Sequence, residues 1–180
     1  MQRIRSNGRR RIIFEIVALS LIVLFVALDQ ITKYHFAAVL QYGQTQPVIE
    51  GFFYFTYVLN KGAAWSFLND VAWAQTVFKI LTLIAIAVFG YFSYISSKKG
   101  YKWLKIALSF AISGALGNFI DRVILGSVID FIGFTFGTYN FPIFNLADSF
   151  LVVGVAMIMI HLFFLDKNAI FKRKDGQKED

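Results

Sequence analysis

Long apolar runs alternate with short polar stretches along the chain, and this alternation predicts four membrane-spanning helices. A helix of about 20 predominantly apolar residues is long enough to cross the hydrocarbon core of a bilayer. The predicted helices cover residues 12–33, 71–97, 103–123 and 143–165. The first follows an arginine-rich start, as in a cleavable signal peptide, but no small-x-small site closes it before Asp29, so we expect it to be retained. The pattern therefore predicts an all-α membrane protein with four transmembrane helices.

Two of the segments between the predicted helices have a composition that favours strands. Residues 45–68 and 126–141 are rich in aromatic and β-branched side chains, as in "VIEGFFYFTYVL". Tyrosine and tryptophan are favoured where a membrane meets water. We expect these segments to form a small β-rich extracytoplasmic cradle. It lies on the membrane surface or packs over the bundle as a hairpin, and the two arrangements are compatible.

The composition supports an integral membrane protein rather than a soluble domain. Hydrophobic residues make up 57% of the chain and charged residues 16%, whereas a soluble domain carries about 25% charged residues. We expect a single membrane-embedded domain over residues 1–180. The absence of cysteine excludes disulfides, thiolate nucleophiles and thiolate metal sites. The absence of an HExxH pattern argues against a zinc protease.

Basic residues are concentrated in three segments, and their distribution predicts the topology. Fourteen of the 18 lysines and arginines fall in residues 1–11, 97–105 and 166–180. Because basic loops stay in the cytoplasm, both termini are expected inside, and segments 29–70 and 121–142 outside. The net charge of +7 is then a topology signal with some attraction to anionic lipid, and we expect no nucleic-acid partner.

Six charged residues are expected at one depth, near the outer boundary of the membrane. They are Asp29, Lys33, Asp121, Arg122, Asp130 and Asp148. A charged side chain at membrane depth costs about 2.5–3.5 kcal/mol, so each needs a partner or a function. Asp29 and Lys33 are four residues apart on one helix face and predict an ion pair. Asp121 directly before Arg122 predicts a second one.

Asp130 and Asp148 are the candidates for acid–base chemistry. Asp130 lies in the apolar "VIDF", where desolvation would raise the pKa of a carboxyl, although a solvated loop acid is an alternative. Two carboxyls brought close together share one proton, so such a pair can activate water and protonate a leaving amine. Asp148 also fits a capping box with Asn145. Capping and catalysis both remain open for it at this point.

The third predicted helix carries a row of small residues. They are Ser109, Ser113, Gly114 and Gly117. Small residues at this spacing let helices approach closely, and polar ones bond across to neighbours. We expect helix packing rather than chemistry from this row.

Five short motifs occur in order along the chain. They are "DQITK" (Asp29–Lys33), "NKGAAW" (Asn60–Trp65), "GALGNFIDR" (Gly114–Arg122), "VIDF" (Val128–Phe131) and "FNLADS" (Phe144–Ser149). Together they resemble the bacterial lipoprotein signal peptidase family, also called signal peptidase II. The resemblance implies a membrane aspartic endopeptidase of the bacterial plasma membrane. Such an enzyme removes the signal peptide from diacylglyceryl-modified prolipoproteins by cleaving before the lipidated cysteine.

The same resemblance implies roles for individual residues. Asp130 and Asp148 would form the catalytic dyad, with no metal and no cofactor. The positions that would line the substrate groove are Asn60, Asn118, Arg122 and Asn145, and those that would support the site or the structure are Asp29, Lys33 and Asp121. The implied partners are lipid-modified prolipoproteins, membrane lipid and globomycin-type inhibitors. We expect the chain to act as a monomer.

Two other function classes remain open on the residues alone. An ion-coupled transporter also uses intramembrane acids, and a scaffold or assembly factor would need no chemistry. Transporters often show inverted repeats and acidic residues near the middle of the bilayer. This sequence shows no convincing repeat and gathers its acids at one face, which favours the peptidase.

Overall fold

The computed structural model describes the backbone of residues 2–62 and 73–166, with side chains described from residue 12 onward. Parts of three predictions lie outside these residues. They are the end of the first outer segment (63–68) with the "AAW" of "NKGAAW", the start of the predicted second helix (71–72), and most of the basic segment 166–180.

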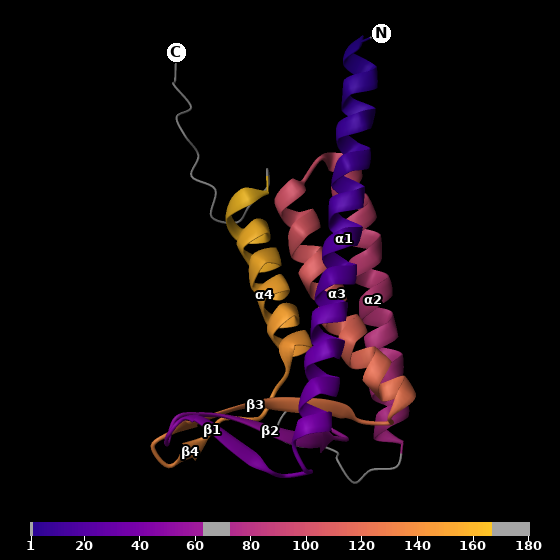
Figure 1. Cartoon of the computed structure of the whole chain (residues 1–180). Coiled ribbons are helices and arrows are strands. Elements are labelled where there is room, and N and C mark those ends of the chain that lie inside the picture. Colours follow the sequence, from indigo (N-terminus) through magenta and orange to yellow (C-terminus); the bar gives the residue numbers. More distant parts are fainter. Residues whose placement is uncertain (1, 63–72, 167–180) are drawn as a thin grey trace.

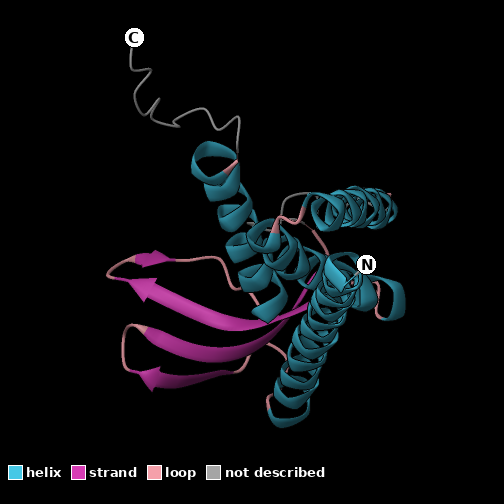
Figure 2. Cartoon of the chain, turned by 90° about the horizontal axis from the view of Figure 1, so that it is seen from above, coloured by secondary structure: helices cyan, strands magenta, loops and turns pink. Residues whose placement is uncertain are grey.

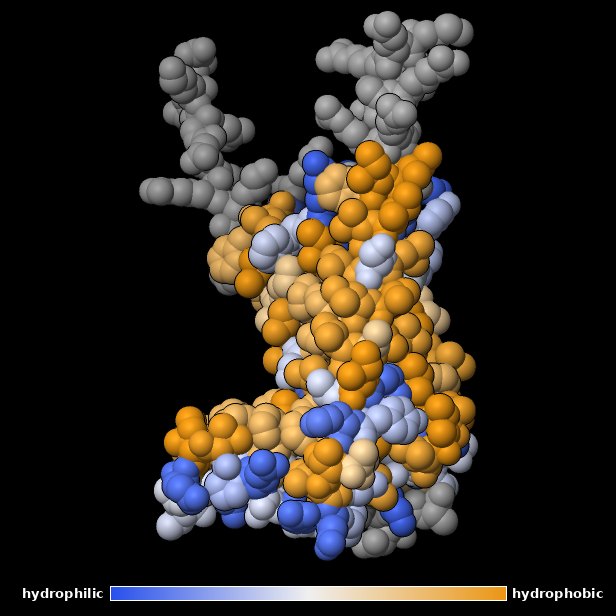
Figure 3. Space-filling view, in the orientation of Figure 1, coloured by the Kyte–Doolittle hydropathy of each residue, from blue (hydrophilic) through white to orange (hydrophobic). Residues whose placement is uncertain are grey.

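Four helices within the described residues are long and apolar enough to cross a membrane. They are α1 (Gln2–Val39), α2 (Ala74–Lys99), α3 (Lys102–Ile124) and α4 (Leu146–Ile160), which continues as a π-helical turn, η2 (His161–Leu165). The helices form one bundle (Figure 1), and large apolar side chains cover its outer surface (Figure 3). An apolar surface of this extent is unfavourable in water and suits the hydrocarbon of a bilayer. The predicted four-helix membrane fold is confirmed.

The helix α3 is the most buried of the four and contacts the other three. Its buried face consists largely of small residues, which let neighbouring backbones approach closely. A Cβ at Gly114 would overlap the backbone of Ala147 and Leu151 in α4. The predicted packing role of this row is therefore confirmed. However, Ser109 and Ser113 donate to carbonyls of their own helix rather than across to neighbours.

A four-stranded antiparallel sheet lies across one end of the bundle and extends to one side of it (Figure 1, Figure 2). Its strands, in spatial order, are β1 (Thr45–Ile49), β2 (Phe53–Asn60), β3 (Val128–Phe136) and β4 (Tyr139–Asn140). Between β2 and β3, Val58 pairs with Asp130 and Asn60 pairs with Val128. The sheet thereby brings the end of one outer segment beside the strand that carries Asp130.

The two faces of this sheet differ in polarity. Apolar side chains cover the side toward the helices, and hydrophilic ones gather on the side away from them (Figure 3). Aromatic rings pack against each other across the strands: the Phe53 and Phe134 ring centroids are 4.9 Å apart. An amphipathic sheet at the end of an apolar bundle matches the predicted β-rich cradle.

The helix α1 continues to Val39, beyond the predicted end at residue 33. The polar residues predicted to mark its end are buried inside the bundle rather than exposed at a membrane boundary. Asp29 and Lys33 are both completely inaccessible to solvent. They contact residues of α3 and the start of α4 instead of marking the end of a span. Polar residues within a helix therefore signal an internal contact here.

The helix α4 begins at Leu146, later than the predicted residue 143. Asn145 is the N-cap, with an extended backbone at φ −133° and ψ −178°. The preceding residue, Phe144, forms an antiparallel bridge with Ile132 of β3. The chain therefore passes from the sheet into α4 through a single capping residue, which places Asp148 close to β3.

Candidate active site

Lys33 lies at the centre of a buried charge cluster between α1 and α3. Its Nζ is 2.8 Å from Asp29 Oδ2, 3.0 Å from Asp121 Oδ2 and 2.9 Å from Asn118 Oδ1. An ammonium group carries three donors, and each has an acceptor here. A buried charge is tolerated when it is paired and hydrogen-bonded in this way.

The predicted ion pair between Asp29 and Lys33 is confirmed, but the predicted partner of Asp121 is wrong. Asp121 pairs with Lys33 instead of Arg122, because consecutive residues on a helix do not face each other. Gln30 completes the cluster by donating to Asp121 Oδ1 at 2.9 Å and to Asp29 Oδ2 at 3.2 Å. Gln30 was not among the predicted site residues, although it lies inside the "DQITK" motif.

The two carboxylates of this cluster also hold the backbone next to each candidate aspartate. Asp121 Oδ2 accepts a hydrogen bond of 3.1 Å from the amide of Ile129, which directly precedes Asp130. Asp29 Oδ1 accepts one of 2.8 Å from the amide of Ala147, which directly precedes the second candidate. The ammonium group of Lys33 binds two carboxylates, and each of these carboxylates holds the backbone directly before one candidate aspartate.

Asp148 forms the predicted capping box with Asn145. Asn145 Oδ1 accepts from the Asp148 amide at 2.9 Å, and Asp148 Oδ2 accepts from the Asn145 amide at 3.2 Å. Capping occupies only one oxygen of this carboxylate. The other, Oδ1, accepts from Asn118 Nδ2 at 2.7 Å, and the residue also lines a cavity. Capping therefore explains only part of the contacts of Asp148: it does not explain the hydrogen bond from Asn118 or the position beside the cavity.

Asn145 connects the two candidate aspartates. Its side-chain Nδ2 donates to Asp130 Oδ1 at 2.7 Å, and its backbone amide donates to Asp148. Asn60, at the end of β2, donates to Asp130 Oδ2 at 3.0 Å. Within the described part of the chain, neither carboxylate forms an ion pair with a cation. Their polar partners are neutral amides, unlike those of the Lys33 cluster.

Burial and the nearby charge of Asp148 raise the pKa of Asp130 from 3.8 to about 7. Desolvation is the largest cause, because the side chain is only 2% exposed. The negative charge of Asp148 is the second cause of the higher pKa, whereas the amides of Asn60 and Asn145 oppose the shift. Burial shows that the solvated-loop alternative for Asp130 is wrong. The carboxyl is poised to gain or lose a proton near neutral pH.

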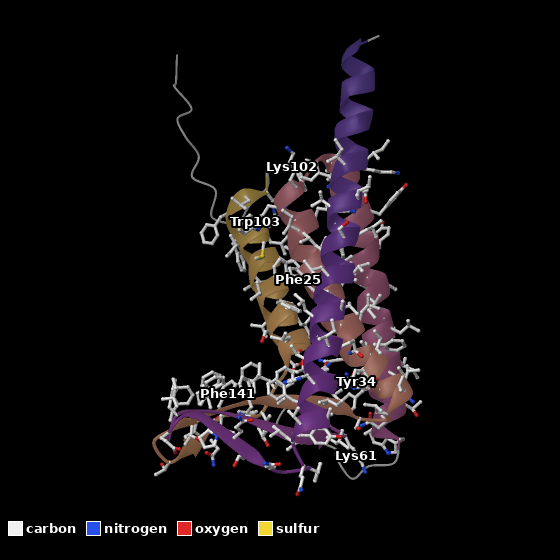
Figure 4. All side chains as sticks on the ribbon, in the orientation of Figure 1. Phe25, Tyr34, Lys61, Lys102, Trp103 and Phe141 are labelled. Atoms are coloured by element: carbon white, nitrogen blue, oxygen red, sulfur yellow. The ribbon has the colours of Figure 1, made fainter. Side chains whose placement is uncertain are left out.

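Both carboxylates line one cavity of about 570 Å³ between β3, α3 and α4. Arg122 contributes to its polar wall, and Val152 and Val153 of α4 contribute to its apolar wall. Val152 is 68% exposed on the outside of the bundle, so the cavity opens toward the surface that faces lipid. Phe141 also lines the cavity and lies on the side of the sheet toward the helices (Figure 4).

Among the described residues that line this cavity, Arg122 is the cation. Its guanidinium carbon lies 5.6 Å from the centre of the Phe78 ring in α2. Its buried Nε has no hydrogen-bond partner among the described residues. A buried donor without a partner is unfavourable, and a ligand carbonyl in the cavity would satisfy it.

The family model described as "Signal peptidase (SPase) II" matches residues 21–164, a range that includes every residue of this site. The chain belongs to the signal peptidase II family. Enzymes of this family are aspartic peptidases that remove signal peptides from prolipoproteins. The predicted peptidase class is confirmed, and the transporter and scaffold alternatives are excluded.

Two curated relatives illustrate the similarity to signal peptidase II. The lipoprotein signal peptidase of Bacillus pumilus is 44% identical over 137 residues, which cover 76% of this chain and 86% of the relative. The lipoprotein signal peptidase of Chromobacterium violaceum is 45% identical over 143 residues, which cover 78% and 86%. The chain is therefore a multi-pass membrane protein of bacteria.

Two solved structures, both described as bacterial membrane enzymes, share this fold. One, at 2.3 Å resolution, is 38% identical with a TM-score of 0.75, covering 89% of this chain and 94% of its own. The other, at 1.9 Å resolution, is 37% identical with a TM-score of 0.71, covering 85% and 94%. The bundle and sheet described above are thus those of a membrane enzyme.

Proposed function

We propose that Asp130 and Asp148 are the catalytic pair of this peptidase. The observation that carries the proposal is their shared cavity, in which two carboxylates face neutral amides and form no ion pair with the described residues. Carboxyls in such a setting share one proton, so one serves as acid while the other serves as base. The pKa of Asp130, raised to about 7 by burial and by Asp148, supports its role as the protonated member.

The reaction then follows the aspartic route. A water molecule between the carboxyls attacks the scissile carbonyl carbon, and its proton passes to Asp148 while Asp130 protonates the carbonyl oxygen. Collapse of the tetrahedral intermediate breaks the C–N bond. The leaving amine takes the proton from Asp148, and Asp130 recovers its own proton from the hydroxyl of the intermediate.

The substrate is the signal peptide of a diacylglyceryl-modified prolipoprotein, cut before the lipidated cysteine. Acyl chains remain in the bilayer, so they hold the scissile bond near the membrane boundary. A cavity at the junction of helices and sheet, with Val152 and Val153 in its wall, suits that depth. Arg122, Asn60, Asn118 and Asn145 bind the peptide beside the dyad.

The supporting residues act through position rather than through contact with substrate. Asp29, Lys33 and Asp121 hold the backbone before each catalytic aspartate. Globomycin-type cyclic peptides would compete for the same cavity. The whole chain, residues 1–180, works as one membrane-embedded domain and as a monomer.

We infer that both termini lie in the cytoplasm and that the active site lies near the outer face of the bacterial plasma membrane. Lysines gather at the α2–α3 connection, at the end of the bundle opposite the sheet (Figure 1). Basic connections are retained in the cytoplasm. The sheet and the catalytic pair at the other end are therefore extracytoplasmic.

Cleavage assays with the purified full-length chain test this proposal. The enzyme is expected to cut a precursor peptide carrying a diacylglyceryl cysteine and to leave the unmodified peptide intact. Asp130→Asn and Asp148→Asn are each expected to remain folded and to lose cleavage. Retained cleavage by either variant would reject the dyad, and equal cleavage of both peptides would reject the requirement for lipid.

A further inference from the structure

A second cavity lies at the end of the bundle opposite the sheet, where α2 connects to α3. It has a volume of about 450 Å³, and its wall combines the α2–α3 connection with Phe14 and Glu15 of α1. Lys102, which lines it, is at the far end of the helices from Phe141 (Figure 4). The peptidase reaction makes no use of this cavity.

The wall of this cavity is strongly basic. Four lysines line it: Lys98, Lys99, Lys102 and Lys105. Lys105 is neutralised by Glu15, with Nζ 2.6 Å from Oε2. Within the described residues, the other three lysines form no ion pair with an acid. The adjacent first turn of α3 has no side-chain cap, so the positive end of its helix dipole adds to the same field.

Aromatic rings lie against three of these ammonium groups, including that of Lys99, whose Nζ is 5.8 Å from the centre of the Tyr101 ring. Lys102 Nζ is 4.6 Å from the centre of the Phe14 ring, and Lys98 Nζ is 4.4 Å from the centre of the Tyr94 ring. Such contacts restrain a flexible lysine without neutralising its charge. Tyr94 is also 53% exposed on the outside of the bundle. The positively charged wall of the cavity therefore lies next to a surface of the bundle that faces lipid.

We propose that this cavity binds the phosphodiester headgroup of an anionic phospholipid such as phosphatidylglycerol. Basic pockets between transmembrane helices suit such headgroups, and the neighbouring apolar helix surface suits the acyl chains. A free phosphate ion would match the charge but leave the aromatic and lipid-facing surface unused. The rule that basic loops are cytoplasmic explains the number of lysines. It does not require that they surround a cavity.

Native mass spectrometry of the full-length protein in a neutral detergent tests this site. Dioleoyl phosphatidylglycerol is expected to bind at least about fivefold more tightly than dioleoyl phosphatidylcholine, since one lysine at a headgroup contributes about 1 kcal/mol. Lys102→Gln is expected to weaken phosphatidylglycerol binding about fivefold. Lys79→Gln, an equal charge change on α2 outside the cavity wall, is expected to leave binding unchanged.

A cavity-filling variant separates a defined site from a diffuse basic surface. Ser97 lines the cavity, so Ser97→Trp keeps every lysine and removes space, and it is expected to abolish the preference for phosphatidylglycerol. Cleavage of the lipidated peptide by each variant shows that it is folded. The proposal is overturned if Ser97→Trp binds like the unmodified protein or if the two lipids bind equally. Inorganic phosphate binding as tightly as phosphatidylglycerol would overturn the assignment to lipid.

Discussion

Four aspartates, three of them buried and Asp148 half-buried, lie where the helices meet the sheet, and they form two pairs whose charge is balanced in different ways. Asp29 and Asp121 share the ammonium group of Lys33. Asp130 and Asp148 instead share the amides of Asn145 and line an open cavity. The first pair, Asp29 and Asp121, shares a cation, and we call it the matched pair. The second pair, Asp130 and Asp148, forms no ion pair with the described residues, and we call it the unmatched pair.

Under the proposed function, this difference separates a structural pair of carboxylates from a catalytic pair within one hydrogen-bond network. A cation beside a buried carboxylate favours its ionised form. Two carboxylates without a paired cation hold a proton between them, which makes it available for reaction. The matched pair also holds the backbone before each member of the unmatched pair. In the proposed mechanism, rigid ionic contacts thereby position a site that must itself remain free to exchange protons.

The largest expected effect comes from removing a proton carrier of the unmatched pair. Asp130→Asn is expected to lower the rate of cleavage about 10²–10⁴-fold, the usual contribution of a positioned acid or base. Steady-state cleavage of a lipidated peptide measures it. Asp121→Asn is the comparison on the matched pair, and its main effect is expected on thermal stability. Equal rates for Asp130→Asn and the unmodified enzyme would contradict the distinction.

The Asp130→Asn variant is also expected to change how the stability of the protein depends on pH. The pKa of Asp130 is raised from 3.8 to about 7, so the folded state binds more protons than the unfolded state between these values. Stability is therefore expected to fall as pH rises from about 4 to about 7. Thermal unfolding of Asp130→Asn across this range should lack that contribution.

The next largest effect is expected at the centre of the matched pair. Lys33→Met leaves two buried carboxylates without a cation and is expected to destabilise the fold by about 3–5 kcal/mol. Thermal unfolding in detergent measures the change. Lys79→Met removes a lysine from α2 that forms no ion pair with the described residues, so it serves as the control. An unchanged melting temperature for Lys33→Met would show that the cluster is not structural.

A smaller effect is expected at the helix contact that holds α4, and with it Asp148, in place. Gly114→Ala puts a Cβ against the backbone of α4 and is expected to destabilise the protein by about 1–3 kcal/mol. At Gly90, on α2, an added Cβ meets open space. Gly90→Ala is therefore expected to leave stability unchanged or to raise it by up to about 1 kcal/mol. Similar losses in both variants would refute this account of the contact.

The smallest expected effect is a shift in the pH dependence of cleavage. Activity should fall as pH rises through about 7, where Asp130 loses its proton. The amide of Asn60 favours the ionised form of Asp130 and so lowers its pKa. Asn60→Ala should move the alkaline limb upward by about one pH unit. Asn140→Ala, in β4 and outside the cavity wall, should not move it.

The sequence predicted those features that depend on neighbouring residues or on composition. The apolar runs were sufficient to predict the four helices because a helix that crosses the hydrocarbon core needs about 20 predominantly apolar residues. The capping box of Asn145 and Asp148 was predictable because its two members are three residues apart on one turn. The ion pair of Asp29 and Lys33 followed from their spacing of four on α1.

Features that depend on how helices pack were not predictable from spacing. The partner of Asp121 is Lys33, which comes from another helix and lies far away in the sequence. Gln30 gains its role only because α1 packs against α3 at that level. The end of α1 was misplaced because buried polar residues resemble the polar end of a span until their partners are known.

The central claim is that Asp130 and Asp148 hold one proton between them, and infrared difference spectroscopy tests it most directly. Spectra of the full-length protein at about pH 6 and pH 8 would compare its protonated carboxyl groups. We expect one buried carboxyl to be protonated at the lower pH, to lose its proton near pH 7 and to be absent from Asp130→Asn. A signal that persists unchanged in Asp130→Asn, or no protonated carboxyl at pH 6, would contradict the account.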